Sequence, residues 1–131
     1  MSCVICTVTT KDYLFHFESF IKSFKLLEIK KDIVFLIECI DFEEFDKQYI
    51  KSILMSYKLL DKVNFIYSIS GTKTIEEKRG YATNRRAFLL CEALSYESEL
   101  IIYADINTLF LKGVDDLINN STSKTTIIFD E

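Results

Sequence analysis

Two oxygen-bearing side chains follow a short apolar run and could bind a hard metal ion. The run LIIYA at residues 100–104 leads into Asp105, Ile106 and Asn107. If the chain stays extended there, residues 105 and 107 point to the same side, because side chains alternate along a strand. A carboxylate and an amide oxygen suit a hard divalent cation, which keeps its other positions for water and a ligand's phosphate oxygens. The same residue types are common in a turn with a helix cap, so both interpretations stay open.

Other familiar catalytic patterns are missing from the sequence. The glycines stand at 71, 80 and 113 only, so neither a dinucleotide-binding GxGxxG nor a Walker A loop is present. The single histidine, His16, falls among apolar residues at helical spacing, so no Ser-His-Asp triad can be assembled. In an open parallel sheet the ligand binds outside the carboxyl ends of the strands. The polar residues that follow the first two apolar runs are Thr9, Thr10, Lys11, Asp12 and Tyr13, and then Asp41.

Apolar periodicity alternates between strand and helix along the chain. Apolar or β-branched runs predict five strands, at residues 3–9, 33–40, 63–69, 100–104 and 125–129. Helical spacing predicts helices at 13–27, 41–60 (capped by Asp41), 83–95 and 114–118, and residues 70–80 are predicted as a loop. Strands that alternate with helices predict an α/β fold, a three-layer sandwich with a mostly parallel sheet, in a single domain over residues 1–131.

Composition excludes several classes of protein. Sixteen basic against twenty acidic residues give a net charge of −4, and no basic cluster exceeds a pair, which argues against nucleic acid as a partner. The apolar run at residues 33–37 is far shorter than the roughly 20 residues that cross a bilayer. The first ten residues lack the charged and small-residue features of a signal peptide. We therefore expect no membrane span and a cytoplasmic location.

Four cysteines bear on the redox compartment. Cys3 and Cys6 form a CxxC, but alternation along the first strand sends them to opposite faces. Neither a second CxxC nor a histidine pair is present. These cysteines are therefore predicted to be reduced, buried and structural, which favours a reducing compartment.

The stretch from residue 81 to 117 resembles the central signature of GT-A glycosyltransferases, most closely glycogenin and the bacterial lipopolysaccharide galactosyltransferases. In that signature a helix with Tyr-x-x-Asn-x-Arg precedes an apolar strand, a D-x-D motif, an apolar triplet and an acidic pair. Residues 4–24 are also similar to the family's first strand and helix. The matching residues here are Tyr81, Asn84, Arg86, the D-x-D-like Asp105-Ile106-Asn107, Leu109-Phe110-Leu111 and Asp115-Asp116.

The resemblance implies a hexosyltransferase domain with a GT-A, Rossmann-like nucleotide-binding fold. Its ligand would be a nucleotide-diphosphate sugar, a UDP-hexose above all, held through Mn²⁺ or Mg²⁺. Asp105 and Asn107 would hold the ion, and Arg86 would pair with phosphate or orient Asp105. Tyr13 would stack on the base, and Thr9 and Ile106 complete the implied nucleotide-sugar site. Arg85 is an alternative match for Arg86, and packing on the core is the alternative role for Tyr13.

Two departures from the family pattern bear on activity. Asn107 replaces the second carboxylate of the motif, which lowers the charge available to a cation. The family takes a further metal ligand, commonly histidine, and its acceptor site from a later segment, whereas only Asp130 and Glu131 follow the last predicted strand. We therefore expect a nucleotide-sugar-binding half truncated before the acceptor half, inactive alone and completed by self-association or a companion segment.

Two other functions are compatible with the sequence. Residues 105–108 approach the D-x-D-x-T signature of haloacid-dehalogenase-like phosphotransferases. In that class the motif usually follows the first strand, and Asn107 would forfeit the acid/base carboxylate. A non-catalytic α/β interaction domain is the third hypothesis.

Overall fold

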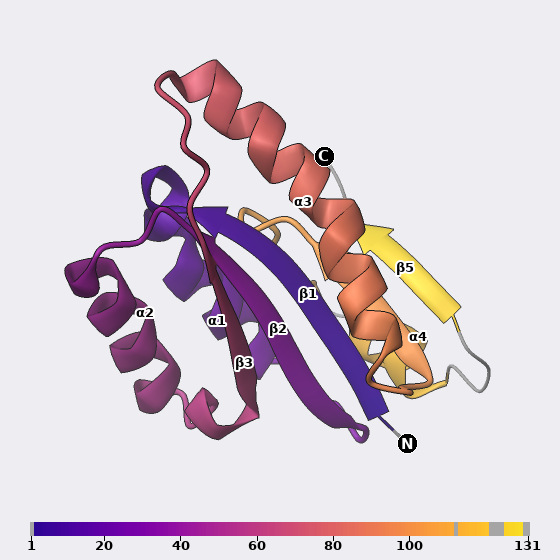
Figure 1. The fold of residues 1–131 in the computed structure, drawn as a ribbon. Coiled ribbons are helices and arrows are strands. Elements are labelled where there is room, and N and C mark those ends of the chain that lie inside the picture. Colours follow the sequence, from indigo (N-terminus) through magenta and orange to yellow (C-terminus); the bar gives the residue numbers. More distant parts are fainter. Residues whose placement is uncertain (1, 112, 121–124, 130–131) are drawn as a thin grey trace.

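Five parallel strands form one sheet between two layers of helices (Figure 1). The computed structural model describes residues 2–111, 113–120 and 125–129. Each predicted strand is confirmed to within one residue at either end, and so is the predicted α/β sandwich with a parallel sheet. The sheet has the order β3-β2-β1-β4-β5. Its strands are β1 (Ser2–Thr10), β2 (Asp32–Ile40), β3 (Val63–Ser68), β4 (Leu100–Ala104) and β5 (Thr125–Phe129).

The helices divide unequally between the two faces of the sheet. The α-helices are α1 (Phe17–Lys25), α2 (Glu44–Ser56), α3 (Ile75–Leu94) and α4 (Val114–Asn119), with short 3₁₀ helices η1 (Lys11–His16) and η2 (Leu60–Lys62). Buried residues of α1, α2 and α4 join the core on one face, and those of α3 join the core on the other. Within the described ranges, no helix has the length and apolar character needed to cross a bilayer.

The direction of the chain reverses at β1. From β1 the chain runs through β2 to β3, and α3 then carries it back across the sheet to β4, on the other side of β1. Because β-α-β crossovers are right-handed, a reversal of direction requires the crossover helix on the opposite face. The carboxyl ends of β1 and β4 therefore lie at a switch point, where open parallel sheets have their ligand crevice.

The start of α3 corrects the predicted loop at residues 70–80. The helix begins at Ile75, and the Thr74 side chain accepts the backbone N–H of Glu77 at 3.1 Å. The Glu77 carboxylate in turn accepts the N–H of Lys73 at 3.1 Å. A Thr three residues before a Glu is a helix-start signal that the sequence carries. The charged stretch KTIEEKR conceals it, because it has no apolar periodicity of its own.

The buried faces of α2 and α3 also differ from the predicted ones. The cap of α2 is Glu43, which forms a capping box with Asp46, and not Asp41. The helical spacing of Phe45, Tyr49 and Ile53 predicts one buried stripe, but the Phe45 side chain is 79% exposed. In α3 the buried residues are Leu89 and Ala93, whereas Cys91 and Leu94 are exposed. Arg85 and Arg86 lie on the side of α3 that faces the sheet. The spacing of apolar residues in α3 therefore does not identify its buried side.

A buried ion pair joins α3 to the sheet. Glu38 of β2 is fully buried, and the Arg85 guanidinium donates to both of its oxygens, from Nε to Oε2 at 2.6 Å and from Nη2 to Oε1 at 2.9 Å. The Ser68 hydroxyl donates to the same carboxylate at 2.9 Å. The hydrogen bond to Glu38 is the main cause that raises the pKa of Arg85. The guanidinium also lies over the Phe88 ring, with its Cζ atom 3.7 Å from the ring centroid.

Removing Arg85 should destabilise the fold strongly. The Arg85→Leu variant leaves the Glu38 carboxylate buried, and among the described residues the Ser68 hydroxyl is its one remaining side-chain partner. Removing one partner of a buried pair costs about 3–5 kcal/mol. Urea unfolding measures this cost. The double variant Glu38→Leu/Arg85→Leu should recover much of it, since no buried charge remains, and a double variant less stable than Arg85→Leu alone would contradict this explanation.

The cysteines should differ sharply in reactivity. Cys3 and Cys6 are buried on opposite faces of β1, as predicted, and Cys39 is also buried, whereas Cys91 is exposed. Burial raises the pKa of each of the three buried thiols to about 12. Because the thiolate is the reactive form, an aromatic disulfide reagent should label one thiol per native chain and four in denaturant. Cys91→Ser should remove the native reaction, and rapid labelling of a second thiol in the native chain would contradict the prediction.

Candidate functional site

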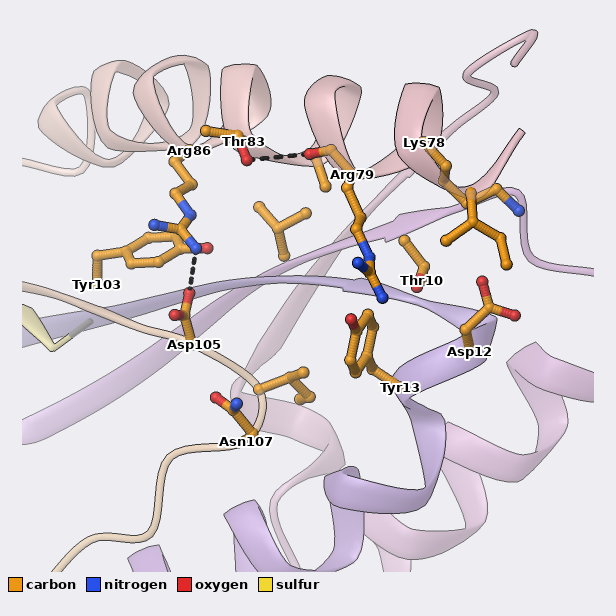
Figure 2. A pocket seen from close by; sticks show the side chains of 14 residues that line it. Thr10, Asp12, Tyr13, Lys78, Arg79, Thr83, Arg86, Tyr103, Asp105 and Asn107 are labelled. Carbon is orange, nitrogen blue, oxygen red and sulfur yellow. Dashed lines mark hydrogen bonds and ion pairs between the residues drawn. The ribbon is translucent and has the colours of Figure 1, made fainter. Parts of the chain in front are cut away.

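A cavity of about 560 Å³ lies at the switch point, between α3 and the carboxyl ends of β1 and β4 (Figure 2). The pairing of β4 with β1 reaches only to Tyr103 opposite Cys6, although β1 continues to Thr10. The strands separate beyond that pair, and Val8 and Thr10 of β1 line the space between them. Thr10 is 5% exposed, and its hydroxyl makes no hydrogen bond to any residue in the described ranges.

The D-x-D-like segment forms a turn at the end of β4. The backbone N–H of Thr108 donates to the carbonyl of Asp105 at 2.9 Å, which closes the turn around residues 106 and 107. Residues 105–107 therefore do not continue the strand, as the metal-site interpretation assumed. They form a turn, as the other interpretation of this segment predicts. Asp105, Ile106 and Asn107 nevertheless all line the cavity.

Arg86 of α3 meets the turn from the opposite wall. Its Nη2 lies 2.9 Å from Oδ1 of Asp105, and its guanidinium lies over the Tyr103 ring, 5.4 Å from the centroid. Burial, followed by the charge of Asp105, raises the pKa of Tyr103. Of the roles expected for Arg86, contact with Asp105 is the one present here. The neighbouring Arg85 is held by Glu38 and does not line the cavity.

Residues after β1 supply the third wall. Tyr13, in η1, packs against the core, which is the alternative role considered for it, and also lines the cavity, so stacking on a base stays a prediction. Figure 2 shows the Arg79 side chain extending from α3 toward Tyr13. Thr9 does not line the cavity, since it is buried and its hydroxyl donates to the Thr10 carbonyl at 3.1 Å. Alternation along β1 directs Thr10 toward the α3 side and Thr9 away from it.

Two further cations of the site were missed by sequence reasoning. Lys78 and Arg79 line the cavity from the first turns of α3, in the stretch predicted as a loop. The capping signal at Thr74 could have placed them on a helix, one turn before Ala82 and two turns before Arg86. Three cations and two carboxylates line the cavity, which is therefore positive in a chain of net charge −4.

A small polar network holds Lys78. The Asp41 carboxylate accepts the Ser70 hydroxyl at 2.6 Å and the Ser70 N–H at 2.8 Å, and lies 3.7 Å from Nζ of Lys78. Asp41 has a φ of 58°, a left-handed conformation that Asp and Asn tolerate better than most residues. Burial acts to raise the pKa of Asp41, but the Ser70 hydrogen bonds and the charge of Lys78 outweigh it, so the pKa is lowered.

The side chains that line the cavity offer few of the charged oxygen ligands that a divalent cation requires. In the part of the chain that the structure describes, no three His, Cys, Asp or Glu side chains gather into a metal-binding group. Asp105 already has a guanidinium 2.9 Å away, and Asn107 contributes no charge. The remaining carboxylate of the lining, Asp12, lies at the other end of the cavity in Figure 2. This set does not fit a tightly held Mn²⁺ or Mg²⁺, because such ions depend on carboxylate charge.

No protein-family model matches the sequence, and no curated protein matches it.

The Asp41 network should make stability depend on pH. Because the folded-state pKa of Asp41 is lowered, its contribution is complete above the unfolded value, about 3.9, and is lost as the pH falls through the folded value. Asp41→Asn should therefore reduce the free energy of unfolding by about 1 kcal/mol at neutral pH and by much less in acid. Urea unfolding at both pH values measures this difference. The exposed Asp61→Asn is the control, and an equal cost of Asp41→Asn at both pH values would contradict the prediction.

Proposed function

We propose that this chain binds a nucleotide-diphosphate sugar as the donor-binding half of a GT-A glycosyltransferase. The observation that carries the proposal is the cavity at the switch point between β1 and β4. It combines an aromatic ring from η1, a row of cations from α3 and the D-x-D-like turn after β4. These are the chemical groups that a base, a diphosphate and a sugar require.

The base would lie at the Tyr13 end of the cavity. An aromatic ring offers a stacking surface to a planar base. Tyr13 is well suited to this, because its side chain both packs against the core and lines the cavity. The Arg79 guanidinium, which Figure 2 shows directed toward Tyr13, would cover the other face of the base or reach the first phosphate.

The diphosphate would lie under α3. During sugar transfer the bond between the anomeric carbon and the diphosphate oxygen breaks, and the leaving diphosphate keeps the electron pair. Cations fixed beside that oxygen stabilise the developing charge without having to reorganise. Arg86 is fixed in this way, because Asp105 holds its guanidinium at 2.9 Å and Tyr103 lies beneath it.

Transfer also requires an acceptor held beside the donor with water excluded. We propose that a companion segment or a second copy of the chain supplies the acceptor site, and that this chain alone does not transfer sugar. Asp130 and Glu131, which follow β5, lie outside the described residues.

Ligand-induced thermal stabilisation tests the proposal. With Mn²⁺ present, UDP-glucose or UDP-galactose should raise the melting temperature, since a ligand at about 100 times its Kd adds about 2.7 kcal/mol. Tyr13→Leu keeps apolar packing but removes the stacking surface, so it should reduce the shift. Phe15→Leu is the matched control, because Phe15 belongs to the same 3₁₀ helix and is 70% exposed.

Two results would contradict the proposal. One is the absence of any shift with either sugar nucleotide. The other is stabilisation by acetyl phosphate in their place, which would favour the phosphotransferase hypothesis.

A further inference from the structure

Three cations of α3 form a row along the cavity. Lys78, Arg79 and Arg86 all line it, and the row extends over about 12 Å of helix, since each residue adds about 1.5 Å. Ala82 lies between them on the same side of α3 and, being small, leaves room beneath the helix. A row of this length can contact both phosphates of a diphosphate at once.

The counter-ions of this row are unevenly distributed. Arg86 lies 2.9 Å from Asp105, and Lys78 lies 3.7 Å from Asp41, which is not among the lining residues. Within residues 2–111, 113–120 and 125–129, the Arg79 guanidinium makes neither a hydrogen bond nor an ion pair, and only the Arg79 backbone carbonyl accepts a side-chain hydrogen bond, from Thr83. Figure 2 shows it directed across the cavity toward Tyr13. The cavity therefore has positive charge available to an anion.

The turn opposite the row is a poor site for a divalent ion. Its first side chain, Asp105, is neutralised by Arg86, and its second, Asn107, is uncharged. An ion bound to Asp105 would share one carboxylate with a guanidinium, and like charges in a partly buried site repel strongly. The side chains of Asp105 and Arg86 are 16% and 33% exposed, so solvent screens this repulsion only in part.

We propose that Lys78, Arg79 and Arg86 bind the diphosphate directly and take the place of a divalent cation. This inference rests on the proposed function, whose diphosphate ligand it concerns. Guanidinium groups bind phosphate oxygens through paired, charge-assisted hydrogen bonds, and the lysine adds a point charge. Asp105 then acts as a positioning residue, which aims Arg86 at the phosphates.

Calorimetric titration of the chain with UDP tests the inference. The protein is first stripped of metal, and the titration is done in EDTA and then in Mn²⁺. The Kd for UDP should agree between the two conditions to within about a factor of two. In EDTA, Arg79→Gln should weaken UDP binding about tenfold, because it removes charged hydrogen bonds to phosphate. Lys22→Gln, an exposed cation of α1 on the other face of the sheet, should leave the Kd unchanged.

Inorganic pyrophosphate and the variants separate the possible outcomes. Pyrophosphate should also bind in EDTA and should lose affinity in Arg79→Gln. If UDP binds only with Mn²⁺, the inference is wrong and the proposed function stands. If UDP binds in EDTA but neither Arg79→Gln nor Lys78→Gln weakens it, the row is not the binding site and the inference is wrong. If neither UDP nor UDP-glucose binds in either condition, both fail. Circular dichroism of each variant establishes that it is folded.

Discussion

The handedness of the crossover connections is the constraint on which the site depends. A right-handed β-α-β unit places its helix on one face when the chain moves one way along the sheet and on the other face when it moves back. This chain moves outward from β1 to β3 and returns to β4, so α3 lies opposite α1 and α2. The helix α3 thereby covers the space between β1 and β4. The residues on the inner side of α3 supply most of the charged groups of the cavity.

Two adjacent arginines of α3, Arg85 and Arg86, form ion pairs with different strands. Arg85 and Arg86 point about 100° apart, as successive residues of an α-helix do. Arg85 reaches the buried Glu38 and fastens α3 to β2, whereas Arg86 reaches Asp105 at the end of β4. Near the start of the helix, Lys78 contacts Asp41 at the end of β2. Ion pairs to the sheet therefore fix both ends of the cationic row, and the stability of the fold and the geometry of the cavity share the same helix.

A positive cavity in an acidic chain is an informative combination. A net charge of −4 argues against general attraction to polyanions, yet three of the five charged side chains that line the cavity are cations. Desolvation and low local dielectric strengthen their effect on a small anion inside the cavity. Stacking at Tyr13 and the positive charge along α3 are the two features that favour the compact anionic ligand proposed above, a nucleoside diphosphate.

The sequence by itself determined the strands, the α/β class and the position of the polar segment 105–107 at the end of β4. Apart from Glu38, the run IVFLIECI is apolar on both faces, which is the pattern of a short strand buried on both sides. The tertiary structure decided which polar residues meet in the cavity. Register along β1 turned Thr10 toward α3 and Thr9 away, and the buried Glu38 engaged Arg85 and left Arg86 to Asp105. Lys78 and Arg79 were missed because the inner face of α3 is polar, so hydrophobic periodicity, which detects burial against an apolar core, has no signal where a helix faces a cavity.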